Sequence, residues 1–153
     1  MRNQLWLIFF VAQLIFAQNK FPNPELINFK LNETTMINQS IMDIRNTLSD
    51  NKGNNSIDLD AGNNAYIFGV MIEQILKHIK DLTDIKIFID KDKLNSYNDI
   101  VISRMNEINM VYINWIIGKL DIILTLIQNN HLMNKVRALQ NVARDVQAEI
   151  RRL

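Results

Sequence analysis

The chain of 153 residues contains no cysteine, only two prolines and only four glycines. Without cysteine it can form neither a disulfide nor a thiolate site, so burial of apolar side chains must supply its stability. Few prolines and glycines mean few helix breakers, which favours long helices. The sequence also contains no phosphate-binding glycine loop, dinucleotide fingerprint or Gly-x-Ser-x-Gly motif, so it offers no pattern typical of the enzymes that use them.

The chain has no large excess of charge of either sign, and it contains only two histidines. The 17 basic and 16 acidic residues nearly balance, so no global basic field attracts nucleic acid. His78 and His131 are far apart and have no cysteine to join them, which argues against zinc; we expect His78 on an exposed helix side and His131 in a helix connection. The aspartates do not follow the calcium-loop spacing. We therefore expect no metal, no cofactor, no catalytic residue and no nucleic-acid partner, and predict that the protein is not an enzyme.

The N-terminus has the pattern of an export signal. Arg2 precedes an apolar run from Leu5 to Phe16, which only Gln13 interrupts, and the small Ala17 follows. The run is too short for a membrane span, which needs about 20 residues. We predict that residues 1–17 are a cleaved signal peptide and that residues 18–153 form one secreted, extracellular helical domain.

The first half of the mature chain predicts two helices. Asn23-Pro24-Glu25 favours a helix start, which would run to about Leu48. Residues 49–64, rich in Asn, Asp and Gly, predict a loop, and a second helix would cover residues 65 to about 88, although residues 85–89 alternate as a short strand would. The expected inward residues are Ile27, Leu31, Thr34, Ile37, Ile41, Ile44 and Leu48 of the first helix, and Phe68, Met71, Ile72, Ile75, Ile79 and Leu82 of the second.

A third helix is expected to be the most apolar element. Residues 96–99 resemble a capping box, and the helix would end near Ile127. The segment from Met110 to Ile127 is interrupted by polar residues, so it predicts a core helix rather than a membrane span. Because most of its circumference is apolar, its own bundle or a partner must surround it. Its polar residues, Glu107, Asn114, Gly118, Asp121 and Thr125, form one narrow stripe.

The last helix has the most regular pattern. After a break at residues 129–131, apolar residues recur every three or four positions to the final residue, as in a coiled coil, without a glycine stop; this is the pattern expected of the N-terminal part of a longer helical protein. Together the segments predict an all-α fold, a three- to four-helix up-down bundle. The expected seam of the last helix is Leu132, Val136, Leu139, Val142, Val146, Ile150 and Leu153.

Surplus apolar surface without catalytic motifs predicts a secreted, non-enzymatic helical interaction module. It would bind a protein partner or a second copy through apolar helix faces, and the alternative is an extracellular carrier of hydrophobic ligands or lipid. Trp115 is expected in the core among Tyr112, Ile116 and Ile117. The candidate interaction residues are Trp115, Ile116, Leu139, Val146 and Ile150.

Two further features concern the surface. Asn32, Asn38 and Asn54 each begin an Asn-x-Ser/Thr sequence, so we expect a glycoprotein in which Asn32 and Asn38 lie on the solvent side of the first helix. The last helix also carries an excess of basic residues. They form either the solvated face of a bundle helix or a basic surface for an anionic membrane or an acidic partner. Its charged residues are Lys135, Arg137, Arg144, Arg151 and Arg152 against Asp145 and Glu149.

Overall fold

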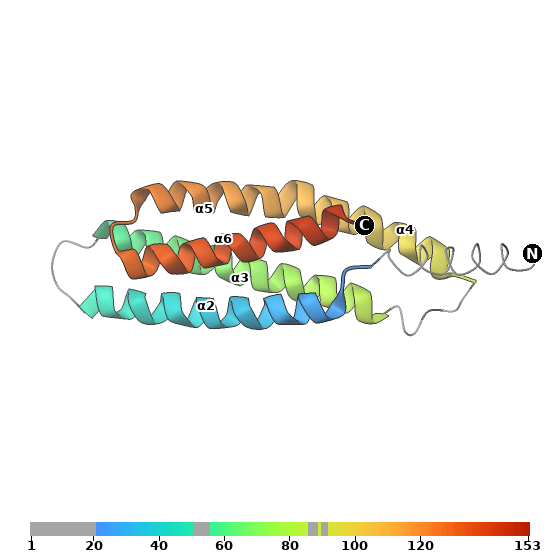
Figure 1. The fold of residues 1–153 in the computed structure, drawn as a ribbon, viewed down its shortest axis with the longest axis horizontal. Helices are drawn as coiled ribbons and strands as arrows, with labels where there is room; N and C mark the ends of the chain where they lie inside the picture. Colours follow the sequence, from blue (N-terminus) through green and yellow to red (C-terminus); the bar gives the residue numbers. More distant parts are fainter. Residues whose placement is uncertain (1–20, 51–55, 86–88, 90–91) are drawn as a thin grey trace, which may run out of the picture.

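The computed structural model describes residues 21–50, 56–85, 89 and 92–153, and in these ranges the fold is all-α, with four helices packed as a bundle (Figure 1). The predicted signal peptide, the Asn54 site and most of the possible strand at 85–89 lie outside the described residues. The first two helices are α2 (Pro24–Asp50) and α3 (Ser56–Ile85). The third consists of α4 (Leu94–Glu107), a π-helical turn η2 (Ile108–Ile113) and α5 (Asn114–Leu126), and the fourth is α6 (Asn130–Arg151).

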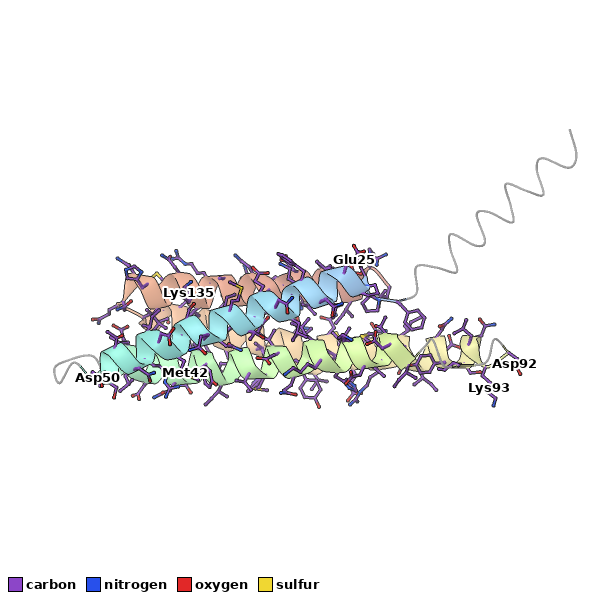
Figure 2. All side chains as sticks on the ribbon, turned by 90° about the horizontal axis from the view of Figure 1, so that it is seen from below. Glu25, Met42, Asp50, Asp92, Lys93 and Lys135 are labelled. Atoms are coloured by element: carbon purple, nitrogen blue, oxygen red, sulfur yellow. The ribbon has the colours of Figure 1, made fainter. Side chains whose placement is uncertain are left out.

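Successive helices run in opposite directions (Figure 1). α2 packs against α3 and α6, and α5 packs against the same two helices, so α2 lies diagonally across the bundle from α5. The start of α4, next to Asp92 and Lys93, extends beyond the ends of the other helices (Figure 2). There Tyr97 stacks on Phe21, and its hydroxyl donates a hydrogen bond to the Leu82 carbonyl of α3 at 2.5 Å.

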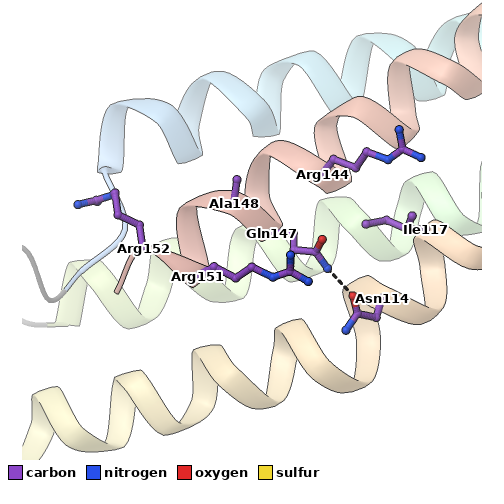
Figure 3. A pocket seen from close by; sticks show the side chains of 7 residues that line it. All are labelled: Asn114, Ile117, Arg144, Gln147, Ala148, Arg151 and Arg152. Carbon is purple, nitrogen blue, oxygen red and sulfur yellow. Dashed lines mark hydrogen bonds between the residues drawn. The ribbon is translucent and has the colours of Figure 1, made fainter.

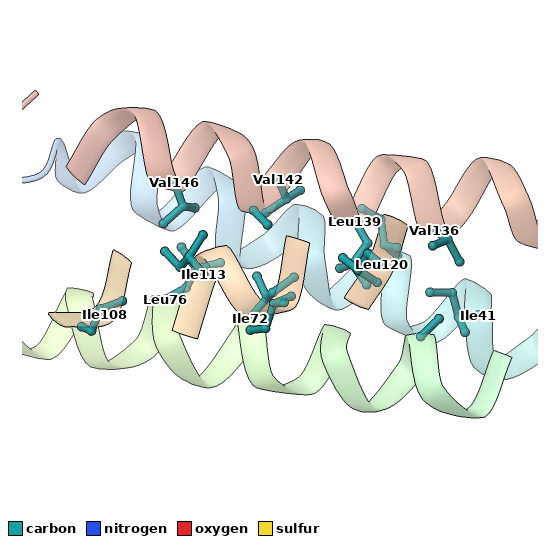
Figure 4. Close-up of a cluster of buried hydrophobic side chains, with 14 of the residues drawn as sticks. Ile41, Ile72, Leu76, Ile108, Ile113, Leu120, Val136, Leu139, Val142 and Val146 are labelled. Carbon is teal, nitrogen blue, oxygen red and sulfur yellow. The ribbon is translucent and has the colours of Figure 1, made fainter. Parts of the chain in front are cut away.

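The seam of α6 forms the centre of the core, as predicted. Its apolar side chains point toward those of the other helices (Figure 4). Burying one such side chain contributes about 1.5–3 kcal/mol, so this seam is a major source of stability for a chain without disulfides. The seam residues Leu132, Val136, Leu139, Val142, Val146 and Ile150 are all at most 2% exposed.

The π-helical turn corrects the phase of the third helix. Along its buried side, apolar residues recur every three or four positions except between Ile108 and Ile113, which are five apart. A regular α-helix would turn Ile113 away from the core, but a π turn accommodates one extra residue. Ile108 and Ile113 are therefore both buried, at 3% and 2% exposure, whereas Val111 faces solvent.

Asparagine caps begin two of the helices. The Asn23 side chain accepts a hydrogen bond from the Glu25 amide at 3.0 Å, which confirms the predicted start of α2. The Asn129 side chain accepts one from the Leu132 amide at 3.0 Å at the start of α6. Each cap satisfies a backbone donor that the helix itself leaves unpaired.

Two buried carboxylates hold these caps in place from other helices. The Asn23 amide donates to Glu149 Oε1 of α6 at 2.7 Å. The amides of Gln128 and Asn129 donate to Asp58 Oδ1 of α3 at 2.7 and 3.2 Å. Both N-cap residues are thus tied by their own amide to a second helix, so the two ends of the bundle are aligned by charge-assisted hydrogen bonds.

The start of α3 corrects the sequence prediction. Residues 56–64 are helical, although their Asn, Asp and Gly content predicts a loop. Ala61 and Gly62 are buried, and the absence of a side chain at Gly62 leaves room for Arg45 of α2 and Leu132 of α6. Tertiary packing therefore overrides local propensity here.

The third helix also departs from expectation at two places. It begins at Leu94 rather than within residues 96–99, and its N-cap Lys93 makes no capping hydrogen bond through its side chain. Trp115 is 47% exposed, so the prediction that it lies in the core is wrong. The neighbouring Ile116 takes the inward position because the π turn sets the phase of α5.

α2 and α3 fit together through polar side chains of α2 and glycines of α3. A Cβ atom added at Gly69 would lie 1.8 Å from Asn38 Oδ1, and one at Gly62 would lie 3.0 Å from Arg45 Cγ. Arg45 also lies over the Tyr66 ring, 5.5 Å from its centroid. Asn38 is only 5% exposed, so the expectation that it lies on the solvent side is wrong.

The glycines of the bundle predict opposite responses to alanine. Gly69→Ala should lower the free energy of unfolding by about 1–3 kcal/mol, because its Cβ collides with Asn38. Gly118→Ala, where no atom lies within 4 Å of the added Cβ, should raise it by about 0.5–1 kcal/mol. Urea unfolding of both variants measures the difference. Asn38→Ala should rescue Gly69→Ala, and equal effects at the two glycines would contradict this packing.

Candidate interaction surface

One side of the third helix is apolar and faces away from the bundle. It is formed by residues spaced mostly three or four positions apart, and we call it the outer stripe. Its side chains other than glycine are 47% to 69% exposed, and no atom lies within 4 Å of a Cβ added at its glycine. Between Glu107 and Lys135 the only charged side chains are Lys119 and Asp121. The outer stripe consists of Met110, Val111, Trp115, Gly118, Ile122 and Leu126.

Trp115 joins the outer stripe to α3. Its ring meets the edge of Phe68 at a centroid distance of 5.3 Å and an interplanar angle of 75°, and Lys119 Nζ lies 5.9 Å from its centroid. Phe68, Met71 and Ile75 of α3 are half-buried and pack against the core. These three residues were predicted to face inward from the second helix. They instead lie at the margin of the core, where Phe68 contacts Trp115 of α5.

The continuous helix Leu94–Leu126 is long and apolar enough to cross a membrane by length and composition alone, a test that core helices of soluble proteins also pass. Only 33% of its most apolar window is buried. The helix therefore contributes one side to the core, and the outer stripe is left uncovered by the described residues. The expectation that the helix is surrounded on several sides is thus not met by the described part of the bundle alone.

The polar stripe predicted for the third helix lies mainly where α5 meets α6. Asp121 Oδ1 accepts a hydrogen bond from Gln140 Nε2 at 2.6 Å, and Arg144 lies 3.7 Å from the same oxygen. Farther along the same two helices, Gln147 of α6 donates a hydrogen bond to Asn114 of α5 (Figure 3). These contacts form a polar border along the outer stripe.

A groove beside this border is lined by arginines. Its volume is about 620 Å³ (Figure 3). Arg137, Arg144 and Arg151 are seven residues apart, so they lie along one edge of α6; we call them the arginine row. Within the described part of the chain, neither Arg137 nor Arg151 forms an ion pair. The groove is lined by Asn114, Ile117, Arg144, Gln147, Ala148, Arg151 and Arg152.

The remaining arginine of the groove is engaged elsewhere. Arg152 donates two hydrogen bonds to Glu149, at 2.6 and 3.1 Å. These bonds, with the one from the Asn23 amide, hold the pKa of the Glu149 carboxyl below its ordinary value although burial opposes the shift. Glu149 is therefore a structural anion of the bundle end. Of the other two arginines of the groove, Arg151 forms no ion pair within the described residues and Arg144 has only its exposed 3.7 Å contact with Asp121.

The structure separates the predicted interaction residues. Ile116, Leu139, Val146 and Ile150 are at most 2% exposed in the core, whereas Trp115 is accessible on the outer stripe. A partner of the closed bundle can therefore contact only Trp115 among them. Val111, Ile122 and Leu126 were not predicted as interaction residues. They recur with Trp115 and Gly118 at three- to four-residue spacing, so a second apolar periodicity on the same helix could have revealed them.

The other predicted positions are also placed. His78 is exposed on α3, as predicted, whereas His131 lies in the first turn of α6 rather than in a connection. Asn32 is exposed on α2. Among the described residues, no group of three or more His, Asp or Glu side chains is arranged to hold a metal ion.

The chain matches no protein-family model, and comparisons with curated proteins and with solved structures found no match.

The positions of the asparagines predict which one carries a glycan. When the protein is exported from a eukaryotic host, Asn32 should be modified and Asn38 should not, because the Asn38 amide lies in the α2–α3 interface and donates to Glu73 at 3.3 Å. Peptide mass mapping before and after deglycosylation measures both. A glycan on Asn38 in the folded, exported protein would contradict the packing of α2 on α3.

Glu149 predicts a pH-dependent stability. Because its folded pKa is depressed, its contribution is present above the ordinary value of 4.5 and is lost as the pH falls through the lower folded pKa. Glu149→Gln should lower the free energy of unfolding by about 1–2 kcal/mol at neutral pH, and this deficit should shrink below that ordinary value. Urea unfolding at several pH values measures it. A deficit that stays constant across this range would refute the role of the charge.

Proposed function

We propose that this protein is a secreted, non-enzymatic helical interaction module that binds its partner through the outer stripe. The observation that carries this proposal is the exposure of a spaced apolar row on a helix whose opposite side already completes the core. We further propose that residues 1–17 direct export and are removed. N-terminal sequencing of the exported protein tests that step, since an intact Met1 would contradict it.

Physical chemistry supports binding through the outer stripe. Contiguous apolar patches on the surface of soluble monomers are small, and larger ones mark sites of interaction. A partner that covers the stripe gains about 25 cal/mol for each Å² of apolar surface removed from water. Gly118 lies in the middle of the stripe with open space above it, so a partner can approach the backbone closely there.

The alternative, a carrier of hydrophobic ligands, would use the same surface. Two surface grooves among the described residues are open to solvent, and both are lined largely by polar and charged residues. Because neither of these grooves offers an apolar enclosure, the carrier would hold its ligand on the outer stripe or between helices that move apart. The exposed Trp115 beside Phe68 favours the surface site.

Site-specific crosslinking tests the outer stripe. Replacing Ile122 with p-benzoylphenylalanine in the exported protein should give light-dependent adducts, because this position is 56% exposed within the stripe. The matched control is the same replacement at Met36, which is 73% exposed on the diagonal helix α2. Mass spectrometry of the adducts identifies their chemical class.

The two positions must differ for the proposal to hold. Adducts that form at position 122, whether with protein or lipid, and that Leu126→Glu abolishes, would support binding through the stripe. Adducts at neither position, or equal adducts at both, would refute it. Circular dichroism of each variant must first show an intact bundle.

A further inference from the structure

We infer that the partner of the outer stripe is an anionic lipid surface, with the apolar side chains inserted at the boundary of headgroups and acyl chains and the arginine row bound to lipid phosphates. This inference deepens the proposed function and depends on it. It follows from where the charges of α6 lie relative to the outer stripe.

The arginine row borders the outer stripe. Arg144 and Arg151 share their groove with Asn114, which precedes Trp115 of the stripe. Lys119, whose ammonium lies over the Trp115 ring, supplies a cation toward the α3 side. The apolar row is thus flanked by cations, a pattern typical of helices that lie in the interface of anionic membranes.

The acidic residues of α6 are directed elsewhere. Asp145 forms an ion pair with Lys30 of α2 at 2.6 Å, and Glu149 binds Asn23 and Arg152. On the α5 side the nearby acid is Asp121, which Gln140 and Arg144 contact. The balanced charge of the whole chain therefore conceals a segregated arrangement, in which Arg137 and Arg151 have no ion pair among the described residues and remain available for external anions.

The hydrogen-bond donors that line the groove suit a phosphate. Arg144 and Arg151 offer guanidinium groups, which bind phosphate oxygens through paired hydrogen bonds. Gln147 lies between them on α6, and Asn114 lies opposite it on α5 (Figure 3). Arg144 gives up little to bind, because its ion pair with Asp121 is 3.7 Å long and exposed. A lipid phosphate in the groove would leave its acyl chains at the α6 side of the outer stripe.

The same charges disfavour an antiparallel dimer of this chain. If two outer stripes paired antiparallel about a twofold axis, the α6 edge of one copy would lie beside the α6 edge of the other. Each arginine row would then face a second arginine row, and like charges that face each other oppose association. A lipid surface instead supplies phosphates to the arginines and apolar chains to the stripe at the same time.

Vesicle binding tests this inference. The protein is residues 18–153, which include every described helix, so that Trp115 is the only tryptophan. Vesicles of phosphatidylcholine alone are compared with vesicles of phosphatidylcholine and phosphatidylserine. The anionic vesicles should shift Trp115 emission to the blue and bind the protein in sedimentation, whereas the neutral vesicles should bind it weakly, and added salt should weaken binding to the anionic vesicles.

Two variants separate the charge from the apolar contribution. Arg144→Gln with Arg151→Gln should weaken binding to anionic vesicles roughly 10- to 30-fold, since each basic residue near such a surface contributes about a factor of five. The control is Asn28→Glu with Asn46→Glu, which changes the net charge equally on exposed positions of α2 and should have little effect. Ile122→Glu should abolish the blue shift.

The outcomes distinguish this inference from the proposed function. Failure of the folded protein to bind anionic vesicles, or equal weakening by the arginine pair and by its α2 control, would overturn the lipid assignment. If position 122 nevertheless crosslinks to a protein, the interaction module stands with a protein partner. If position 122 crosslinks to nothing as well, both proposals fail. Inorganic phosphate that displaces the protein from vesicles more strongly than sodium chloride of equal ionic strength, but not when Arg144 and Arg151 are replaced, would support the arginine groove as the phosphate site.

Discussion

Burial of the α6 seam is the contact on which the rest of the bundle depends. A chain without cysteine has no covalent link between its helices, so buried side chains must hold the helices together, and the seam of α6 supplies those that face α2 and α5. α2 and α5 flank α6, and the π turn keeps Ile113 directed toward the core, where Val142 and Val146 also lie (Figure 4). Once both sides of the seam are covered, the remaining apolar side of the third helix has no place inside.

The polar contacts determine how these helices align. Asp58 and Glu149 bind backbone amides at opposite ends of the bundle, where an apolar side chain would leave the donors unsatisfied. The same division of labour extends to the surface. The acids of α6 serve its contact with α2, so its arginines are left on the edge beside α5. Structural demands on one side of a helix thereby concentrate positive charge on the other.

Periodicity was sufficient to predict the all-α class, the seam of α6 and the start of α2, because each depends on local spacing and capping. It was insufficient for the start of α3, since residues such as Asp58, Asp60 and Gly62 are typical of a loop until neighbouring helices pack against them. It also misplaced Trp115, because the five-residue step from Ile108 to Ile113 changes the phase of α5. Asn38 could not be assigned to an interface without knowing that Gly69 faces it. The outer stripe was detectable from the sequence as surplus apolar surface with a second periodicity, but its border of arginines depends on the relative rotation of α5 and α6.

The glycine contacts between α2 and α3 have a consequence for how the fold is specified. Heptad-like seams alone would permit two antiparallel helices to slide by seven residues and still bury apolar side chains. A slide in one direction would place Asn38 over Leu76, and in the other would place Leu31 over Gly69, so neither matches the sizes of the facing residues. Asn38 and Arg45 each leave a buried polar atom without a hydrogen bond among the described residues, which costs stability. The polar and glycine contacts between α2 and α3 thus select one register among several that hydrophobic burial alone would permit.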